Sequence, residues 1–184
     1  MNVPNALTVV RILLVPVLVV ALLEKTSDGD LFAAVVFVVA SLTDAIDGRI
    51  ARSRGSVTTF GKLMDPIADK LLIIAALVAL VSLGRVAAWV AMVIIAREFA
   101  VTVLRVAATG QQGMVISAGP LGKLKTVFQV AMVLALIAVQ GPQPTWLTGL
   151  IYLTVAITVL SGIDYFFVAS RSRVEPRPPA RVDR

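Results

Sequence analysis

The sequence contains no cysteine and no histidine among its 184 residues. Without cysteine, disulfide bridges, thiolate nucleophiles and zinc sites with sulfur ligands are excluded. Without histidine, the chain has no imidazole for acid–base catalysis or for metal binding. Any metal ion that this chain holds must therefore be a hard ion with oxygen ligands.

Polar sequence is scarce as well, because 58% of the residues are hydrophobic and the mean hydropathy is +0.93. These values exceed what a soluble domain with one packed core needs, and they indicate an integral membrane protein. Stretches of about 20 residues, long enough to cross a bilayer as helices, can be assigned six times. The six ranges are 6–23, 31–50, 63–83, 86–108, 121–140 and 145–169. We therefore predict an all-α, polytopic membrane protein with six transmembrane helices.

The two ends of the chain have different characters. The first apolar stretch carries Arg11 and is followed by five more spans without a small-residue cleavage site, so it is interpreted as a retained helix. Asn5 and Thr8 precede this apolar run, and we expect them to cap its helix. Residues 1–170 are expected to form one transmembrane domain. Residues 171–184, RSRVEPRPPARVDR, predict a disordered basic tail.

Basic residues lie mainly on one side of the predicted spans. Those on that side are Arg49, Arg52, Arg54, Lys62, Lys123, Lys125, Arg171, Arg173, Arg177, Arg181 and Arg184. The other side carries Lys25 and Arg85, beside Glu24, Asp28 and Asp30. Because cytoplasmic loops retain Lys and Arg, both termini are predicted to be cytoplasmic. Anionic lipid headgroups would attract the net charge of +6 on this face, whereas no aromatic-studded basic surface indicates a nucleic-acid partner.

Four aspartates stand out in the segment DAIDGRIARSRGSVTTFGKLMDPIADK. Asp44 and Asp47 are three residues apart at the end of span two, and Asp65 and Asp69 are four apart at the start of span three. Both spacings place a pair on one helix face, and the short connection makes the two helices antiparallel neighbours. Four converging carboxylates repel one another unless a cation lies among them, so we expect one or two hard divalent ions. Two ions about 4 Å apart would clamp the attacking and leaving oxygens of a phosphoryl displacement.

Simpler roles for these carboxylates also exist. Acidic residues in membrane spans form proton or cation relays, or ion pairs such as those available with Arg52 or Lys70. The small residues Gly48, Ala51 and Gly61 favour a ligand site, because they let a flat ligand or a facing backbone come close. Arg52 could then bind a pyrophosphate with two parallel hydrogen bonds.

The spacing of these residues carries a family resemblance. The segment reads Asp44-x2-Asp47-Gly48-x2-Ala51-Arg52-x8-Gly61-x3-Asp65-x3-Asp69 and resembles, at every position, the signature of the CDP-alcohol phosphatidyltransferase family. The resemblance implies a six-helix membrane enzyme, usually a homodimer, with residues 1–170 as its catalytic domain. It implies two Mg2+ or Mn2+ ions and transfer of a phosphatidyl group from CDP-diacylglycerol to an alcohol, with release of CMP.

The resemblance also assigns roles to individual residues. Asp44, Asp47 and Asp65 are implied to be metal ligands, and Asp69 is implied to be both a metal ligand and the catalytic base. The residues implied to face the nucleotide of CDP-diacylglycerol are Gly48, Ala51, Arg52 and Gly61.

Other stretches bear on the identity of the acceptor alcohol. NVPNALTVVRILLVP at the start, AREFAVTVLR at 96–105 and GKLKTVFQ at 122–129 resemble the bacterial branch of this family that makes phosphatidylglycerophosphate. Arg97 and Arg105 lie within about 20 degrees of one helix face, and a membrane helix rarely carries two arginines without a buried anion. Lys123 and Lys125 begin span five on the same side. We expect these four side chains to bind the phosphate of glycerol-3-phosphate.

These assignments also have alternatives. Arg97 could pair only with Glu98 or with a carboxylate of the metal site, and the two lysines could be positive-inside anchors. Arg11 is a structural or snorkelling residue as often as a site residue. The sequence leaves the roles of Lys70, Glu98 and Asp164 open.

Rival functions fall into two groups. Within the family, the acceptor could be inositol phosphate, phosphatidylglycerol (as in a cardiolipin synthase) or serine. Outside it, the acidic cluster could belong to a divalent-cation or proton transporter, or to a purely structural membrane subunit.

Overall fold

The structure is a computed structural model that describes the backbone of residues 3–24, 27–54, 59–112 and 119–172. Within these ranges it describes the side chains of residues 9–24, 28–43, 70–105 and 119–168. Six helices and no strand are found in the described ranges, which confirms the all-α prediction and the number of helices. They are α1 (Val3–Leu23), α2 (Ser27–Arg54), α3 (Thr59–Ser82), α4 (Ala88–Gln112), α5 (Pro120–Ala138) and α6 (Thr145–Ser172).

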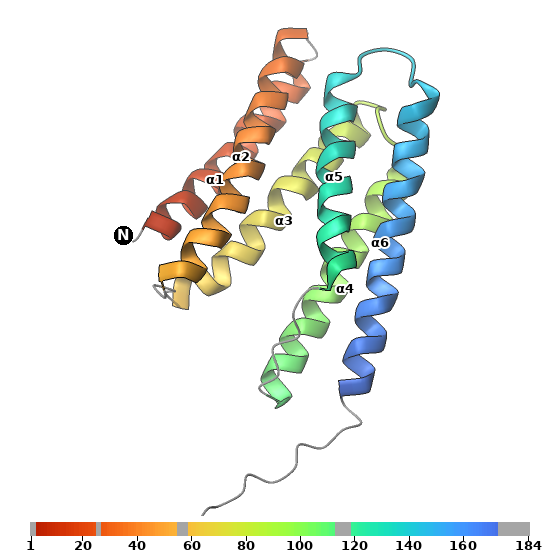
Figure 1. Ribbon diagram of the computed structural model, residues 1–184. Helices are drawn as coiled ribbons and strands as arrows, with labels where there is room; N and C mark the ends of the chain where they lie inside the picture. The colour runs from red at the N-terminus through yellow and green to blue at the C-terminus, as the bar shows by residue number, and fades with distance from the viewer. Residues whose placement is uncertain (1–2, 25–26, 55–58, 113–118, 173–184) are drawn as a thin grey trace, which may run out of the picture.

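The helices form two groups of three that pack against each other (Figure 1). Helices α1, α2 and α3 contact one another, and α6 packs against both α4 and α5. The groups meet where α2 and α3 contact α5 and where α3 contacts α4. Successive helices run in opposite directions, so α2 ends and α3 begins at the same end of the bundle as the end of α4, the start of α5 and the end of α6 (Figure 1). We call this the signature end, because it carries the aspartate segment, and the other the far end.

The interior combines large aliphatic side chains with alanine. The largest fully buried residues include Leu18, Leu22, Phe37, Leu77, Leu80, Ile94, Met132 and Leu136. Alanines lie in the same core at positions 33, 40, 76, 79 and 91. Small side chains let helix backbones approach closely, which is how membrane helices associate when lipid offers no hydrophobic driving force.

The outer surface is also apolar. Phe166 and Phe167 on α6 are each 59% exposed, and Trp146 is 58% exposed. A soluble monomer rarely exposes an apolar surface of this extent, whereas acyl chains would cover it. Among the described residues, α5 and the Thr145–Val168 part of α6 are long and apolar enough to cross a membrane. That the other four helices also cross it stays a prediction.

Helix boundaries differ from the predicted spans at the signature end. Helix α2 continues to Arg54 and α3 begins at Thr59, whereas the predicted spans end at 50 and begin at 63. Hydropathy finds only the apolar part of a helix, while a helix satisfies its own backbone and can extend beyond that part. Helix α1 begins at Val3, so Asn5 and Thr8 lie inside it and the predicted cap is wrong. A proline at residue 4 suits a first turn, where its missing N–H has no partner to lose.

An ion pair connects three elements at the far end. Helix α3 ends in a Schellman turn in which Gly84 has φ +68° and the Arg85 N–H donates to the Leu80 carbonyl at 2.9 Å. This turn directs Arg85 to Asp30 at the start of α2, with 2.6 Å between Nη2 and Oδ2. Arg85 also donates to the carbonyl of Ile137 in the last turn of α5 at 3.1 Å. The charge thus joins α2, the α3–α4 turn and α5 on the side opposite the signature residues.

Candidate functional site

The signature residues lie on the backbone of two neighbouring helices. The residues on α2 are Asp44, Asp47, Gly48, Ala51 and Arg52, and those on α3 are Gly61, Asp65 and Asp69. Both helices are continuous through these positions, so each aspartate pair has the helical spacing that places it on one face. All eight side chains lie outside the described part of the structure. Their convergence on metal or nucleotide therefore stays a prediction.

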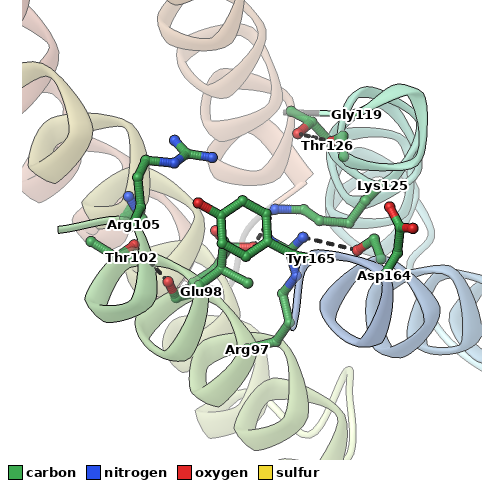
Figure 2. Close-up of a pocket in the computed structure, with 13 residues that line it drawn as sticks. Arg97, Glu98, Thr102, Arg105, Gly119, Lys125, Thr126, Asp164 and Tyr165 are labelled. Carbon is green, nitrogen blue, oxygen red and sulfur yellow. Dashed lines mark hydrogen bonds and ion pairs between the residues drawn. The ribbon is translucent and has the colours of Figure 1, made fainter. Parts of the chain in front are cut away.

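A polar cavity of about 180 Å3 lies beside this segment, between α3, α4, α5 and α6 (Figure 2). The side chains and glycines that line it are Lys70, Arg97, Glu98, Val101, Thr102, Arg105, Gly119, Gly122, Lys125, Thr126, Ser161, Asp164 and Tyr165. Four of these residues are cationic and two are acidic. The cavity therefore carries a net positive charge that suits a phosphate ligand.

Lys70 connects the cavity to the signature. It is the residue directly after Asp69 on α3, and it lines the cavity wall. Consecutive Cα atoms are about 3.8 Å apart, so the backbone of the predicted catalytic base borders the cationic pocket. That the Asp69 side chain acts together with this cavity stays a prediction.

Glu98 lies between two of the cations. Its Oε1 forms an ion pair with Lys125 Nζ and lies 3.5 Å from Arg97 Nη1. All three side chains are at most 13% exposed, so water screens these charges poorly. One carboxylate thus partly neutralises two buried cations, and the pairing of Arg97 with Glu98 that the sequence left open as an alternative is present.

Arg97 is also held by α6. Its Nη2 donates to Ser161 Oγ at 2.9 Å, and the Ser161 hydroxyl donates to the Thr158 carbonyl at the same distance. Gly162 gives the arginine room, since a Cβ there would lie 3.3 Å from Arg97 Cγ. The guanidinium is therefore fixed against the cavity wall by groups on two helices.

Arg105 lies two helical turns further along α4, next to an aromatic ring. Its Cζ is 5.7 Å from the centroid of Tyr165, which is a cation–π distance. Arg97 and Arg105 line the same cavity, as expected from their shared helix face. The ring of Tyr165 is buried, with 6% of the residue exposed.

The two lysines of α5 that were predicted to bind phosphate, Lys123 and Lys125, lie on different sides of the helix. Helix α5 begins at Pro120, with Gly119 at its N-cap, and Lys125 faces inward from its second turn. Lys123 is exposed and does not line the cavity, because a step of two helical residues turns a side chain by about 200 degrees. Gly119 and Gly122 bring the first turn of α5 to the cavity, where the positive end of the helix dipole favours an anion.

Other cavity residues were not predicted from the sequence. A polar stripe on α6, formed by Thr154, Thr158, Ser161 and Tyr165, has spacings of four, three and four and is buried. This spacing is a helix-face signal that could have been found in an otherwise apolar span. Asp164, whose role the sequence left open, is exposed at the cavity beside Gly119, where a Cβ would lie 3.7 Å from Oδ2.

Two further observations bear on what belongs to this site. Arg11 is 2% exposed on α1 and does not line the cavity. Among the side chains that the structure describes, no group of three or more acidic residues could hold a metal ion. The four aspartates of the signature offer the oxygen donors that a hard cation prefers, and their role as metal ligands stays a prediction.

Known proteins resemble this chain over nearly its whole length. A family model described as CDP-alcohol phosphatidyltransferase matches residues 1–160. The chain is 40% identical to the CDP-diacylglycerol–glycerol-3-phosphate 3-phosphatidyltransferase of Bacillus subtilis (strain 168), over 90% of this chain and 93% of the relative. It is also 40% identical to a probable phosphatidylglycerophosphate synthase of Mycobacterium tuberculosis (strain H37Rv), over 92% of this chain and 82% of the relative. A Rickettsia felis enzyme with the same name as the Bacillus protein is 38% identical, over 90% and 93%. The chain belongs to the CDP-alcohol phosphatidyltransferase family.

Proposed function

We propose that this protein is a membrane enzyme that transfers the phosphatidyl group from CDP-diacylglycerol to glycerol-3-phosphate, giving phosphatidylglycerophosphate and CMP. The names of the relatives and the family membership support this reaction. The structural observation that carries it is the position of Lys70. Lys70 follows Asp69 in the chain and lines a cavity that also contains Arg97, Arg105 and Lys125, which supports a site shared by donor and acceptor.

The charge of the cavity supports an acceptor alcohol that carries a phosphate. Its four cations exceed its two carboxylates, so a phosphate dianion would balance the charge that remains. Arg97 and Lys125 share the carboxylate of Glu98, and the Arg97 Nε–H, which has no partner in the described part of the structure, can donate to a phosphate oxygen. Glycerol-3-phosphate would thus be held by its phosphate, with its free terminal hydroxyl directed toward Asp69.

The signature segment would bind the donor substrate, CDP-diacylglycerol. Gly48, Ala51, Arg52 and Gly61 would surround the CDP moiety, and the four aspartates would hold two divalent ions, Mg2+ or Mn2+. The family is generally dependent on divalent cations, and the all-carboxylate donor set fits a hard ion. When bound, the ions would neutralise negative charge on the diphosphate.

The transfer itself is a direct in-line displacement. The acceptor hydroxyl oxygen forms a bond to the phosphorus that bears diacylglycerol, and the bond from that phosphorus to the CMP oxygen breaks. Asp69 orients the hydroxyl and accepts its proton. A covalent enzyme intermediate on cysteine or histidine is excluded by the composition. The residues of the cavity contribute by holding the acceptor phosphate while this exchange takes place.

The location of the site fits the physical state of its substrates. We place all six helices in the bacterial inner membrane, with the signature end, both termini and the active site at the cytoplasmic face, where basic residues cluster. The lipid donor then stays in the bilayer while glycerol-3-phosphate and CMP exchange with the cytosol. The expected assembly is the homodimer that is usual in this family.

A panel of acceptors tests the proposal. Purified protein in detergent with CDP-diacylglycerol and Mg2+ should release CMP with glycerol-3-phosphate, and a chelator should abolish the release. Inositol phosphate, phosphatidylglycerol and serine should give little CMP. Turnover with one of these three but not with glycerol-3-phosphate would overturn the proposed acceptor.

Transport is the rival of a different class. A permeation path needs polar groups at successive membrane depths, whereas the four signature aspartates belong to the last part of α2 and the first part of α3, which lie at one end of the bundle (Figure 1). Flux of Mg2+ or Mn2+ into liposomes, without any release of CMP, would support transport instead.

A further inference from the structure

Tyr165 has a buried hydroxyl group that no group in the described part of the chain satisfies. The residue is 6% exposed on α6, and its phenol oxygen has no hydrogen-bond partner in the described part of the chain. Buried polar groups are almost always hydrogen-bonded, so an orphan hydroxyl in a cavity wall calls for an explanation. Figure 2 shows the Tyr165 ring in the middle of the pocket, among the side chains that line it.

A second orphan lines the same cavity. The Nε atom of Arg97 is buried and also lacks a partner, although the other guanidinium nitrogens contact Glu98 and Ser161. An arginine N–H can only donate, and so can the ammonium groups of Lys70 and Lys125. In the described part of the chain the cavity wall therefore has two buried donors without a partner, the Arg97 Nε–H and the Tyr165 O–H, and a ligand that satisfies both must supply acceptor oxygens.

The position of Arg105 bears on which partner the phenol proton of Tyr165 can have. The guanidinium lies over the tyrosine ring, so it interacts with the π face and offers no acceptor to the phenol proton. The phenol O–H makes no hydrogen bond to the cavity carboxylates Glu98 and Asp164 in the described structure, so an oxygen of a bound anion can accept from it. A phosphate oxygen meets this need, because the charges that attract the phosphate are the groups around the ring.

We infer that Tyr165 is an acceptor-binding residue whose hydroxyl donates a hydrogen bond to the phosphate of the acceptor alcohol. This inference rests on the proposed function for the identity of the acceptor. It assigns two separate tasks to one side chain: the ring positions Arg105, and the hydroxyl selects a phosphorylated alcohol over an unphosphorylated one.

The two tyrosines of the chain provide a matched pair of variants. Tyr165→Phe keeps the ring beneath Arg105 and removes only the hydroxyl. Tyr152→Phe removes a hydroxyl from the same helix at an exposed position, where the ring stacks near Trp89 with centroids 5.9 Å apart. Tyr152 does not line the cavity, so its variant controls for the loss of a phenol on α6.

Inorganic phosphate is the first probe, because its binding needs no catalysis. Thermal unfolding of purified protein in detergent is followed as phosphate is added, and apparent Kd values are taken from the rise in Tm. We expect Tyr165→Phe to weaken phosphate binding about tenfold, which corresponds to the loss of one hydrogen bond to a charged group. Tyr152→Phe should match the wild type. Equal phosphate affinity in all three proteins would overturn the inference.

Stability without ligand separates binding from a structural role. Since the hydroxyl has no partner among the residues that the structure describes, Tyr165→Phe should unfold at the same temperature as the wild type or higher when phosphate is absent. A lower Tm would show that the hydroxyl makes a structural hydrogen bond and would count against the inference.

Steady-state kinetics then connects the site to turnover. Tyr165→Phe should raise KM for glycerol-3-phosphate about tenfold, while KM for CDP-diacylglycerol and kcat stay within about twofold. An unchanged KM for glycerol-3-phosphate would overturn the inference and leave the proposed function standing. A wild-type protein that binds phosphate but does not use glycerol-3-phosphate would overturn the proposed acceptor, while the phosphate titration still decides the role of Tyr165.

Discussion

Glu98 is the group whose removal tests the electrostatics of the cavity most directly. It is paired with Lys125 and lies 3.5 Å from Arg97, and its side chain is 12% exposed. Glu98→Gln keeps the shape and the acceptor oxygen of the side chain but removes its charge. Two buried cations then share a cavity that has lost its innermost carboxylate.

The size of the effect follows from burial. Removing one partner of a buried ion pair costs about 3–5 kcal/mol, because a charge remains in a poorly solvated place. We expect the lower end, about 3 kcal/mol, since the amide oxygen of glutamine still accepts a hydrogen bond from Lys125. For a chain of this length each kcal/mol changes Tm by about 2–4 °C, so Glu98→Gln should lower Tm by about 6–12 °C.

Ligand binding should partly reverse this loss. A phosphate supplies the negative charge that the variant lacks, so glycerol-3-phosphate should raise the Tm of Glu98→Gln more than that of the wild type at the same concentration. The assay is thermal unfolding in detergent, with and without glycerol-3-phosphate. Asp164→Asn is the control, because this carboxylate also lines the cavity but is exposed, and its loss should change stability by about 0.5 kcal/mol or less. Equal Tm values for Glu98→Gln and Asp164→Asn would refute the reasoning.

Further variants test the catalytic group, the cation and the far end. Asp69→Asn should lower CMP release at least about 100-fold with every acceptor, and substantial residual turnover would exclude Asp69 as the base. Lys125→Met should raise KM for glycerol-3-phosphate about 10- to 100-fold, with less effect on KM for CDP-diacylglycerol. Lys123→Met should have the smaller effect, and equal effects of the two lysine variants would contradict the geometry of α5. Arg85→Leu should lower the free energy of unfolding by about 3 kcal/mol, because it leaves the buried carboxylate of Asp30 unpaired. Asp30→Asn in the same chain should recover part of that loss in a double-mutant cycle, and strictly additive effects would show that the pair contributes nothing.

Much of the architecture could be predicted from hydropathy alone. Helices that are apolar over about 20 residues, such as α5 and α6, differ so strongly from their connections that their number and order follow directly. Their ends could not be found in this way. Helix α2 extends through the basic residues to Arg54, and α1 begins before Asn5, because hydrogen bonding along a helix does not depend on lipid contact.

The residues of the cavity could also be predicted only in part from the sequence. Arg97 and Arg105 could be placed on one face from their spacing, since both lie on the same helix. The choice between Lys123 and Lys125 depends on how α5 is rotated against its neighbours, which a single segment does not reveal. Tyr165 and Glu98 acquire their roles only from helices that are distant in sequence, because tertiary packing decides which polar side chains meet.

The position of Lys70 in the cavity wall has a consequence for how the two parts of the proposed site move. Asp69, the proposed proton acceptor, and Lys70, which lines the cavity, are successive residues of one continuous helix. Peptide geometry therefore fixes the distance between their backbones. Any movement of α3 would therefore carry the proposed base and this part of the cavity wall together.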